Sequence, residues 1–319
     1  MKKSIPWIEK YRPTCLDDIM LDPQISKQIK VFIKNNSNTH LVIMGLPGIG
    51  KTSTVKCIAK EILGPNLADG YLELNAAEDR GVKSISMIIP PFCKKVVNFE
   101  EPRIILLDEA DNLTAKCQYD ISSMIKQFGS KTKFVFTCND STRIIEDIQS
   151  ICRIIRFKKL SDEQITAYLE KICQVENIPY KKAGLGTICY ISSGDMRMAI
   201  NNLQLTAYAY QDITKQNVLS VCKLPDPDEI KKIIILCSES KLEEAHSALD
   251  TIISNGYYYQ DIVTCFNYVL INNYEINEGI RLKLIGTVEQ TKIIISSGIR
   301  SRLQLSAMIG RMIKVFMDK

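Results

Sequence analysis

The residues best suited to chemistry lie in a glycine-rich loop, Gly45-Leu46-Pro47-Gly48-Ile49-Gly50-Lys51-Thr52. Glycines adopt backbone angles that are closed to other residues, so successive N–H groups of such a loop can converge on a phosphate. Lys51 would then reach the terminal phosphates of a nucleotide, and the hydroxyl of Thr52 would bind Mg²⁺. The alternative is a turn that happens to contain a lysine, and the rest of the sequence must decide between the two.

A second chemical signal is the acidic end of an apolar run. Ile104-Ile105-Leu106-Leu107 leads directly into Asp108 and Glu109. A carboxylate that leaves a buried strand beside a phosphate loop can hold Mg²⁺ through water, and an adjacent glutamate can orient and polarise an attacking water. A strand that merely ends in solvated acids is the alternative. Because both motifs occur in the expected order, the residues alone indicate a nucleoside triphosphate site.

These side chains must be positioned by the elements around them. The loop lies between an apolar run, Leu41–Met44, and a helix-like segment, 53–62. Further strand-like runs end in polar residues and alternate with helices, which predicts an open α/β parallel sheet with its ligand at the carboxyl edge of the strands. These predicted strands are 71–75, the run 103–111 that ends in acids, 133–139 and 154–157.

Helical patterns follow the predicted sheet. After Ser161 the periodicity is helical, Pro225-Asp226-Pro227 breaks the chain, and everything beyond it is typical of amphipathic helices. This predicts three parts, 1–160, 161–223 and 224–319. One further predicted helix, 22–33, precedes the phosphate loop. The predicted helices after the sheet are 162–176, 184–192, 194–203, 228–237, 242–254, 259–272, 277–296 and 300–317. An apolar stripe on the last of them, from Leu305 to Phe316, favours a core or partner-helix contact over a cofactor site.

Composition excludes several classes of protein. The chain has 319 residues, 45% of them hydrophobic, which is ample for folded cores. The net charge is +5, and the residues ahead of Leu224 carry an excess of +6, so an anionic partner would meet the front of the chain. The eleven cysteines are scattered singly and His40 is far from His246, which indicates neither a zinc site nor a disulfide framework. With no signal-peptide pattern and no membrane-spanning run, we expect an intracellular protein of a reducing compartment that has no membrane partner.

The motifs taken together resemble a small subunit of replication factor C, the AAA+ clamp loader of eukaryotes, archaea and some large DNA viruses. The likeness runs almost end to end, and the segments that carry it are Trp7–Pro13, Gly45–Thr52, Leu74–Gly81, Asp108–Asp111, Cys138-Asn139, Gly194–Arg197 and Asn201–Gln204. It implies an α/β AAA+ P-loop ATPase core with a parallel sheet, a helical lid, and an all-α C-terminal collar for oligomerisation. The first two parts of the chain would be core and lid, and the third the collar.

The resemblance also implies roles for single residues. Tyr11, Arg12 and Pro13 would line the adenine pocket. Glu109 would activate water, while Asn139 and Arg197 would sense the γ-phosphate, with Arg197 arriving from the lid so that ATP pulls lid and core together. The cofactors would be ATP and Mg²⁺, with Thr52 and Asp108 at the metal. The nucleotide-binding residues would also include Gly45, Pro47, Gly48, Ile49, Gly50, Lys51, Thr52 and Ser53.

The function implied by the resemblance is that of an ATPase subunit which opens a sliding clamp and loads it on primer–template DNA. ATP would be hydrolysed to ADP and phosphate, with stimulation by DNA and clamp, and the other subunits of a hetero-pentamer would be partners. Arg80 and Lys83 would contact DNA phosphates, although a solvated charge or an interface salt bridge is an equal alternative for both. The place of action would be the nucleus of a cell or a viral replication site.

Two other functions remain open at this stage. The first is a nucleotide-holding scaffold subunit of the loader that turns over little ATP itself. The second is another AAA+ DNA-remodelling ATPase, such as a branch-migration motor or an initiator. The long helical tail and the absence of a C-terminal winged-helix signature argue against the second.

The chain also departs from the family pattern. Ser150-Ile151-Cys152 stands where the family has a Ser-Arg-Cys finger that reaches a neighbour's ATP site, and Arg153 would restore the same side only in an extended segment. We therefore expect this chain's own site to be active if a neighbour supplies an arginine, and the site it completes to be weak or silent. Gln118–Ser123 replaces a stretch with two adjacent arginines, so its serines would remove positive charge from the subunit interface or the DNA-facing side.

Two further stretches concern partners. Ser86 stands where relatives usually carry arginine, which predicts a thin DNA contact for this subunit. The apolar stretch Met87–Phe92 is compatible with contact to a clamp, but buried helix packing is the favoured interpretation.

Overall fold

The computed structural model describes residues 5–34, 39–76, 82–273 and 275–317, without the side chains of 82–86. The chain divides into two compact units, Met1–Thr214 and Lys215–Lys319. This division falls ahead of the predicted boundary at Leu224, and the three-part domain scheme stays a prediction.

The first unit is built on a five-stranded parallel sheet in the order β2-β3-β4-β1-β5. Its strands are β1 (His40–Met44), β2 (Tyr71–Asn75), β3 (Arg103–Asp108), β4 (Thr132–Cys138) and β5 (Cys152–Arg156). The predicted parallel α/β sheet is thus confirmed, although β5 begins two residues before the predicted strand. Since β3 and β4 are covered on both faces, they consist almost wholly of buried residues.

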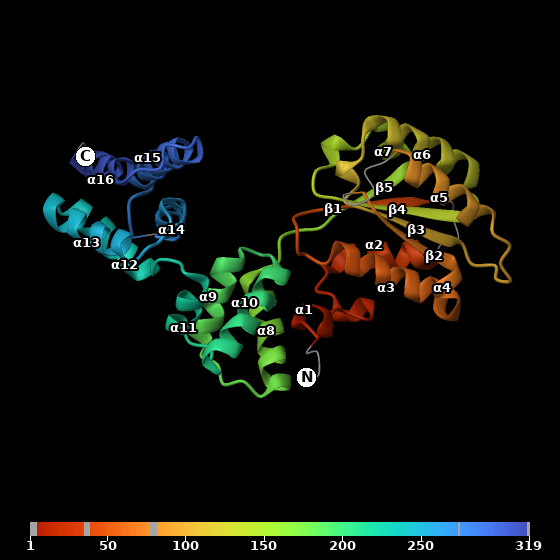
Figure 1. The fold of residues 1–319 in the computed structure, drawn as a ribbon, viewed down its shortest axis with the longest axis horizontal. Coiled ribbons are helices and arrows are strands. Elements are labelled where there is room, and N and C mark those ends of the chain that lie inside the picture. Colours follow the sequence, from red (N-terminus) through yellow and green to blue (C-terminus); the bar gives the residue numbers. More distant parts are fainter. Residues whose placement is uncertain (1–4, 35–38, 77–81, 274, 318–319) are drawn as a thin grey trace. The chain divides into compact units, whose positions relative to one another are not determined.

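Helices cover both faces of the sheet (Figure 1). One face carries α2 (Pro23–Lys34), α3 (Lys51–Leu63) and α4 (Leu67–Gly70), and the other carries α5 (Val82–Lys94), α6 (Ala115–Phe128) and α7 (Glu146–Ile151). Apolar side chains of β3 and β4 pack against α5, α6 and α7 in one buried cluster. This sandwich fixes the carboxyl edge of the strands, where β3 ends in Asp108 and β4 in Cys138.

Three helices complete the first unit: α8 (Asp162–Glu176), α9 (Lys182–Ser192) and α10 (Met196–Tyr210). The bounds of α8 agree with the prediction because Ser161 and Gln164 form a capping box and Asn177 ends the helix in a left-handed conformation. Asp195 is the N-cap of helix α10, where its side chain accepts a hydrogen bond from the Met198 N–H, and the helix runs past the predicted end. A short helix, α1 (Trp7–Lys10), packs against α10.

All regular secondary structure in the described part of the second unit is helical. It contains α11 (Lys215–Cys222), α12 (Pro227–Ser238), α13 (Leu242–Ser254), α14 (Tyr259–Asn272), α15 (Glu278–Ser296) and α16 (Arg302–Met317). The apolar stripe on α16 is buried against α12, α13, α14 and α15. It is therefore core of this unit. Within the described residues, no helix combines the length and apolarity needed to cross a membrane.

Candidate nucleotide-binding site

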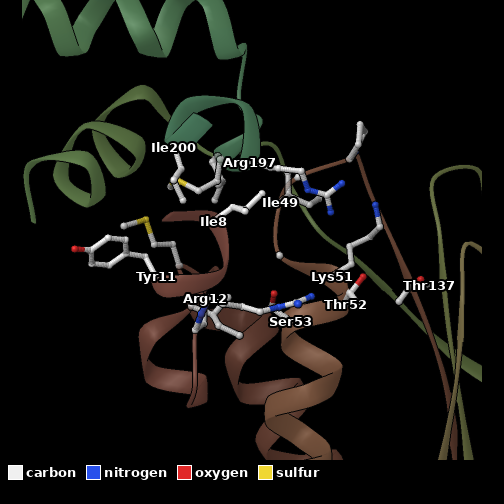
Figure 2. Close-up of a pocket in the computed structure, with 18 of the residues that line it drawn as sticks. Ile8, Tyr11, Arg12, Ile49, Lys51, Thr52, Ser53, Thr137, Arg197 and Ile200 are labelled. Carbon is white, nitrogen blue, oxygen red and sulfur yellow. The ribbon is translucent and has the colours of Figure 1, made fainter. Parts of the chain in front are cut away.

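A cavity of about 260 Å³ lies at the carboxyl edge of the sheet, between the phosphate loop and α10 (Figure 2). It gathers residues from the N-terminal segment, the phosphate loop, β3, β4 and the lid helices. Of the predicted site residues, those lining it are Tyr11, Arg12, Pro13, Pro47, Gly48, Ile49, Gly50, Lys51, Thr52, Ser53, Asp108, Glu109, Asn139 and Arg197. Gly45 is not among the lining residues, but its carbonyl oxygen accepts a hydrogen bond from Nζ of Lys51.

The phosphate loop depends on backbone angles that favour glycine. Gly48 and Gly50 have φ angles of 70° and 92°, in the left-handed region. Gly50 is also the residue at which α3 begins. The free N–H groups of the first turn of α3, together with the positive end of its dipole, make this helix start an anion-binding site.

Lys51 places its ammonium group inside the loop. Its Nζ donates to the carbonyl oxygens of Gly45 and Leu46 at 2.7 and 2.8 Å and to Oδ1 of Asn139 at 2.8 Å. Burial lowers the pKa of Lys51, while the negative charges of Asp108 and Asp111 oppose that effect. An anion in the loop would form stronger, charge-assisted hydrogen bonds with this ammonium than neutral carbonyls do.

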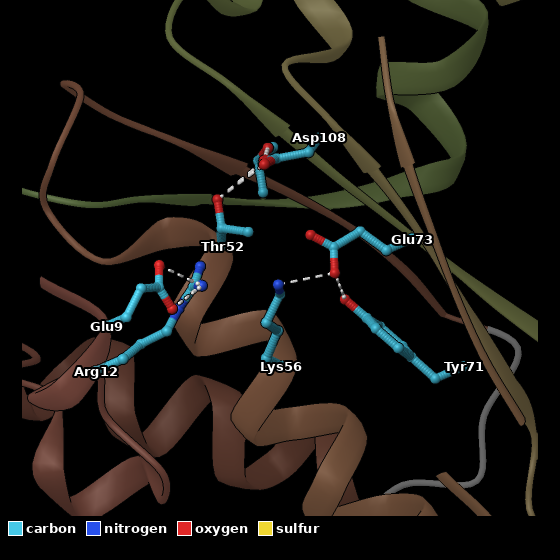
Figure 3. A network of polar contacts seen from close by, with 8 residues as sticks. Glu9, Arg12, Thr52, Lys56, Tyr71, Glu73 and Asp108 are labelled. Atoms are coloured by element: carbon cyan, nitrogen blue, oxygen red, sulfur yellow. Dashed lines mark hydrogen bonds and ion pairs between the residues drawn. The ribbon is translucent and has the colours of Figure 1, made fainter. Parts of the chain in front are cut away.

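Thr52 and Asp108 form the pair expected at a metal. The Thr52 hydroxyl donates to both carboxylate oxygens of Asp108, at 3.0 and 3.1 Å (Figure 3). Thr137 on β4 donates to the same carboxylate from the neighbouring strand. A hydroxyl and a carboxylate at the edge of a phosphate site are the oxygen ligands that Mg²⁺ takes. The residues present therefore fit a magnesium ion.

Glu109 has a special backbone conformation. Its φ and ψ angles are 54° and 42°, the left-handed region that side chains other than glycine rarely adopt. Its N–H donates to Oγ1 of Thr137 at 3.1 Å, and its Oε2 accepts from Nδ2 of Asn112 at 3.2 Å. Such backbone strain is concentrated at functional sites. Here the left-handed conformation accompanies the placement of Glu109 in the lining of the cavity.

Helix α10 touches the phosphate loop directly. The N–H of Met196 donates to the Gly48 carbonyl at 3.1 Å. Arg197, the next residue of α10, extends its guanidinium toward the end of the cavity that holds Lys51 (Figure 2). Asn139, which follows β4, and Arg197 of α10, both expected to sense a terminal phosphate, thus line the same cavity.

The N-terminal segment forms the other end of the cavity. Arg12 forms an ion pair with Glu9 at 3.2 Å, and the Tyr11 carbonyl accepts from the Tyr168 hydroxyl at 2.6 Å. Sulfur of Cys57 lies 3.7 Å from the Pro13 carbonyl, which connects the segment to α3. One wall of the cavity here is apolar and is formed by Ile8, Ile19, Met20, Leu160 and Ile200. Sequence reasoning missed this wall, because its members are ordinary apolar residues that lie far apart in the chain.

The structure does not place the two predicted DNA contacts. Arg80 lies outside the described residues, and Lys83 is in α5 but its side chain is not described. In the same helix Met87 and Ile88 are exposed, by 68% and 38%, whereas Ile89 is buried. The apolar stretch Met87–Phe92 therefore packs against the core with only some of its side chains.

The structure bears on two of the family departures: the extended segment that Arg153 would need is not present, and the expectation about the serines was wrong in detail. Ile151 is the last residue of α7 and β5 starts at Cys152, so the chain is not extended across this stretch. Ile151 is half-buried against the core cluster and Arg153 is exposed, so Arg153 does not simply restore the missing side chain. In α6, Ser122 is buried to 2% exposure, so of the two adjacent serines Ser123 alone contributes to the surface.

Gln118 in the same stretch has an internal role. Its amide nitrogen donates to the carbonyls of Leu113 and Arg143, at 3.2 and 2.9 Å, and its oxygen accepts from the Ile145 N–H at 2.8 Å. With only 2% of its surface exposed, it connects the loop that follows Glu109 to the loop that follows Asn139. It is therefore a structural polar group of the core rather than a surface replacement for an arginine.

Comparison with known proteins agrees with this geometry. Residues 41–160 match the family model of the AAA ATPases associated with various cellular activities, and residues 225–311 match that of the replication factor C C-terminal domain. The chain is 63% identical to a putative replication factor C small subunit of Acanthamoeba polyphaga mimivirus, over 98% of both chains. It is 38% identical to replication factor C subunit 4 of Schizosaccharomyces pombe, over 97% of this chain and 91% of that one.

The fold is also similar to that of solved structures. The branch-migration motor RuvB of Thermotoga maritima superimposes with a TM-score of 0.54 and 17% identity, over 80% of this chain and 90% of that one. At that identity the likeness concerns the fold alone. The similarity in sequence decides the family, and it does not favour the branch-migration alternative: the chain belongs to the replication factor C small-subunit family of AAA ATPases.

Proposed function

We propose that this chain is an ATP-hydrolysing subunit of a sliding-clamp loader, which opens the clamp and loads it on primer–template DNA. Its relatives are replication factor C subunits of viruses, eukaryotes and archaea. The observation that carries the proposal is that one cavity brings Lys51, Asn139 and Arg197 together with the Thr52–Asp108 pair and Glu109. These are the parts that phosphoryl transfer to water requires.

The phosphate end of the cavity would hold ATP and Mg²⁺. Lys51 would exchange its contacts with Asn139 and two carbonyls for contacts with phosphate oxygens, and the N–H groups at the start of α3 would bind the same phosphates. Thr52 and Asp108 would hold Mg²⁺, which neutralises charge on the phosphates.

Glu109 would orient a water against the γ-phosphate and accept its proton, while the bond to the β-phosphate oxygen breaks and ADP leaves. Asn139 and Arg197 would contact the γ-phosphate from the core and from the lid. Loss of the γ-phosphate would release Arg197, and α10 would then keep only contacts such as the Met196–Gly48 hydrogen bond, which would loosen the lid. Hydrolysis would in this way change the shape of the subunit, with stimulation by DNA and clamp.

The remaining parts of the proposal concern partners. Residues 1–160, 161–223 and 224–319 would serve as core, lid and oligomerisation collar in a hetero-oligomer. Arg80 and Lys83 would add sequence-independent contacts to DNA phosphates, so clamp loading would weaken as salt rises. The site of action would be the place of DNA replication, in a nucleus or at a viral replication site.

Loading of a labelled clamp on primed circular DNA, by the complex reconstituted with its natural subunits, tests the proposal. Lys51→Ala should slow loading about tenfold or more, because a charge-assisted phosphate contact is lost. Lys56→Ala is the matched control. Lys56 lies one turn further along α3 and pairs with Glu73 at 2.9 Å, away from the cavity (Figure 3). Equal loading by the Lys51→Ala and natural complexes would refute the proposal.

A scaffold subunit with little turnover of its own is the second candidate. A single observation favours it: Ile151 stands in place of an arginine that would serve a neighbour's site. This observation concerns the neighbouring subunit's ATP site rather than this chain's own cavity. That cavity would supply this chain's own groups for phosphate, metal and water, and a neighbour would supply the arginine. We therefore place turnover in this chain ahead of a scaffold role.

A further inference from the structure

The segment Trp7–Pro13, which forms one end of the cavity, is attached to the lid helices. Trp7 is buried to 5% exposure. Its backbone N–H donates to Oε1 of Gln204 on α10 at 3.0 Å, and its ring packs edge-on against Tyr208 at 5.9 Å between centroids. The beginning of the segment is therefore attached to α10.

Helix α8 holds the end of the segment nearest the cavity. A single oxygen of Glu176, Oε1, accepts hydrogen bonds from the Tyr11 hydroxyl at 2.5 Å and from Nζ of Lys10 at 2.6 Å. The Tyr168 hydroxyl, on the same helix, donates to the Tyr11 carbonyl at 2.6 Å. Both the side chain and the backbone of Tyr11 are thus bound by α8.

Glu176 is an unexpected residue at its position. It is the last residue of α8, where the helix dipole carries its negative end and disfavours a carboxylate. Its pKa is nevertheless lowered, chiefly by the hydrogen bonds from Lys10 and Tyr11. The carboxylate is therefore suited to its partners on the N-terminal segment rather than to its own helix.

We propose that Glu176 is a positioning residue for ATP: it holds Tyr11, and through it Arg12 and Pro13, against the lid, so that affinity for the nucleoside depends on a carboxylate outside the cavity. This rests on the proposed function of the same site. Glu176 is not among the cavity-lining residues, whereas Tyr11, Arg12 and Pro13 are. Figure 2 shows Tyr11 and Lys51 at opposite ends of the cavity.

The lid would then contact the nucleotide at two points. Helix α10 reaches the phosphate end through Met196 and Arg197, and α8 reaches the other end through Tyr11. Helices α8 and α10 pack against each other. Displacement of the lid would consequently disturb both ends of the site together, and Glu176 would affect only the end formed by Tyr11, Arg12 and Pro13.

Equilibrium binding of ATP and of inorganic tripolyphosphate to the full chain tests this proposal. Glu176→Ala should weaken ATP binding about fivefold, because the partly exposed hydrogen bonds that hold Tyr11 and Lys10 to α8 are lost. Tripolyphosphate lacks the nucleoside and should bind equally well to both proteins. Glu176→Gln, whose amide oxygen can still accept from Tyr11, should restore most of the ATP affinity.

Two further variants separate positioning from general damage. Tyr11→Phe removes only the hydroxyl and should show the same selective loss for ATP. Glu170→Ala removes another carboxylate of α8 that makes none of these bonds, and it should leave both affinities unchanged. Since Trp7 is the only tryptophan of the chain, its fluorescence should change on ATP binding by the natural chain and change less in Glu176→Ala.

Unchanged ATP affinity in Glu176→Ala, or an equal loss for ATP and tripolyphosphate, would overturn this proposal and leave the proposed function intact. A natural chain that does not bind ATP would overturn the proposed function, and this proposal with it.

Discussion

The carboxylate of Asp195 occupies the space beside Gly48 in which any other residue would carry its β-carbon. A Cβ atom built on Gly48 would lie 1.7 Å from Oδ1 of Asp195. The same two segments are joined by the hydrogen bond from the Met196 N–H to the Gly48 carbonyl. Gly48 is therefore required both for the left-handed backbone of the phosphate loop and for close contact with the lid.

This relationship predicts that Gly48→Ala weakens ATP binding about tenfold or more. The new methyl group strains a residue at φ 70°, which costs about 1–2 kcal/mol, and it pushes Asp195 and the lid away. Asp195→Ala alone should destabilise α10 by about 1 kcal/mol through loss of its N-cap. In the double variant the clash is absent, so the two losses in affinity should be less than additive. Strict additivity, measured by isothermal titration of all four proteins, would contradict the contact.

The Thr52–Asp108 pair predicts how ATP binding depends on Mg²⁺. Thr52→Val keeps the shape of the side chain but removes the hydroxyl, so Mg²⁺ should no longer raise ATP affinity above its value in EDTA, with a loss of about tenfold. Thr52→Ser keeps the hydroxyl and should retain most of the effect. If Thr52→Val responds to Mg²⁺ as the natural chain does, these residues do not hold the metal.

His40 predicts a loss of stability in mild acid. Burial, followed by the nearby charge of Lys133, lowers the pKa of His40 to about 4, and its Nδ1 accepts from the Phe134 N–H at 3.2 Å. Because the unfolded chain takes up the proton near pH 6.5 and the folded chain does not, stability is complete above pH 6.5 and falls toward pH 4. The free energy of unfolding should drop by about 2 kcal/mol from this residue between pH 7.5 and pH 5.

Urea unfolding at the two pH values measures this drop. His40→Asn offers an amide oxygen as acceptor but cannot be protonated, so its stability should decline less with acid than that of the natural chain. Parallel declines in both proteins would show that His40 is not the group responsible.

Local motifs made the fold and the phosphate end of the site predictable. The run from Gly45 to Thr52 and the strand that ends at Asp108 are contiguous, and their geometry follows from residue type and order. Helix α8 was placed correctly because its capping residues, Ser161 and Asn177, adjoin it in sequence. Helix α5 was not delimited from the sequence, since Pro90 and Pro91, which lie inside it, are ordinarily helix breakers.

The remainder of the site depends on contacts between distant segments. The bonds from Tyr168 to Tyr11 and from Tyr11 to Glu176 join residues more than 150 positions apart, and no local pattern indicates them. Thr137 was overlooked because its role comes from the pairing of β3 with β4 rather than from a motif. The burial of Ser122 likewise depends on which side of α6 faces the core.

Ile151 predicts a gain of activity in the assembled complex. Ile151→Arg should raise ATP turnover at the neighbouring site that this chain completes, because a guanidinium can stabilise charge on the transferred phosphoryl group. The side chain starts at the end of α7 and is half-buried, so the longer arginine can keep its stem on the core and extend its head outward. Ile151→Lys, which lacks the forked donor group, should gain much less. No increase with arginine would mean that this position does not face a phosphate.

The central claim, that this chain's own site takes part in a clamp-loading cycle, is tested most directly through Glu109. The measurement is steady-state ATP hydrolysis by the reconstituted complex, with and without primed DNA and clamp, for the natural chain and for Glu109→Gln. Glutamine keeps the size of the side chain and can occupy the same left-handed position, but it cannot accept a proton from water. We predict that stimulation by DNA and clamp falls in the variant while ATP binding persists. An unchanged rate of hydrolysis would contradict the account and identify the chain as a nucleotide-holding scaffold driven by its neighbours.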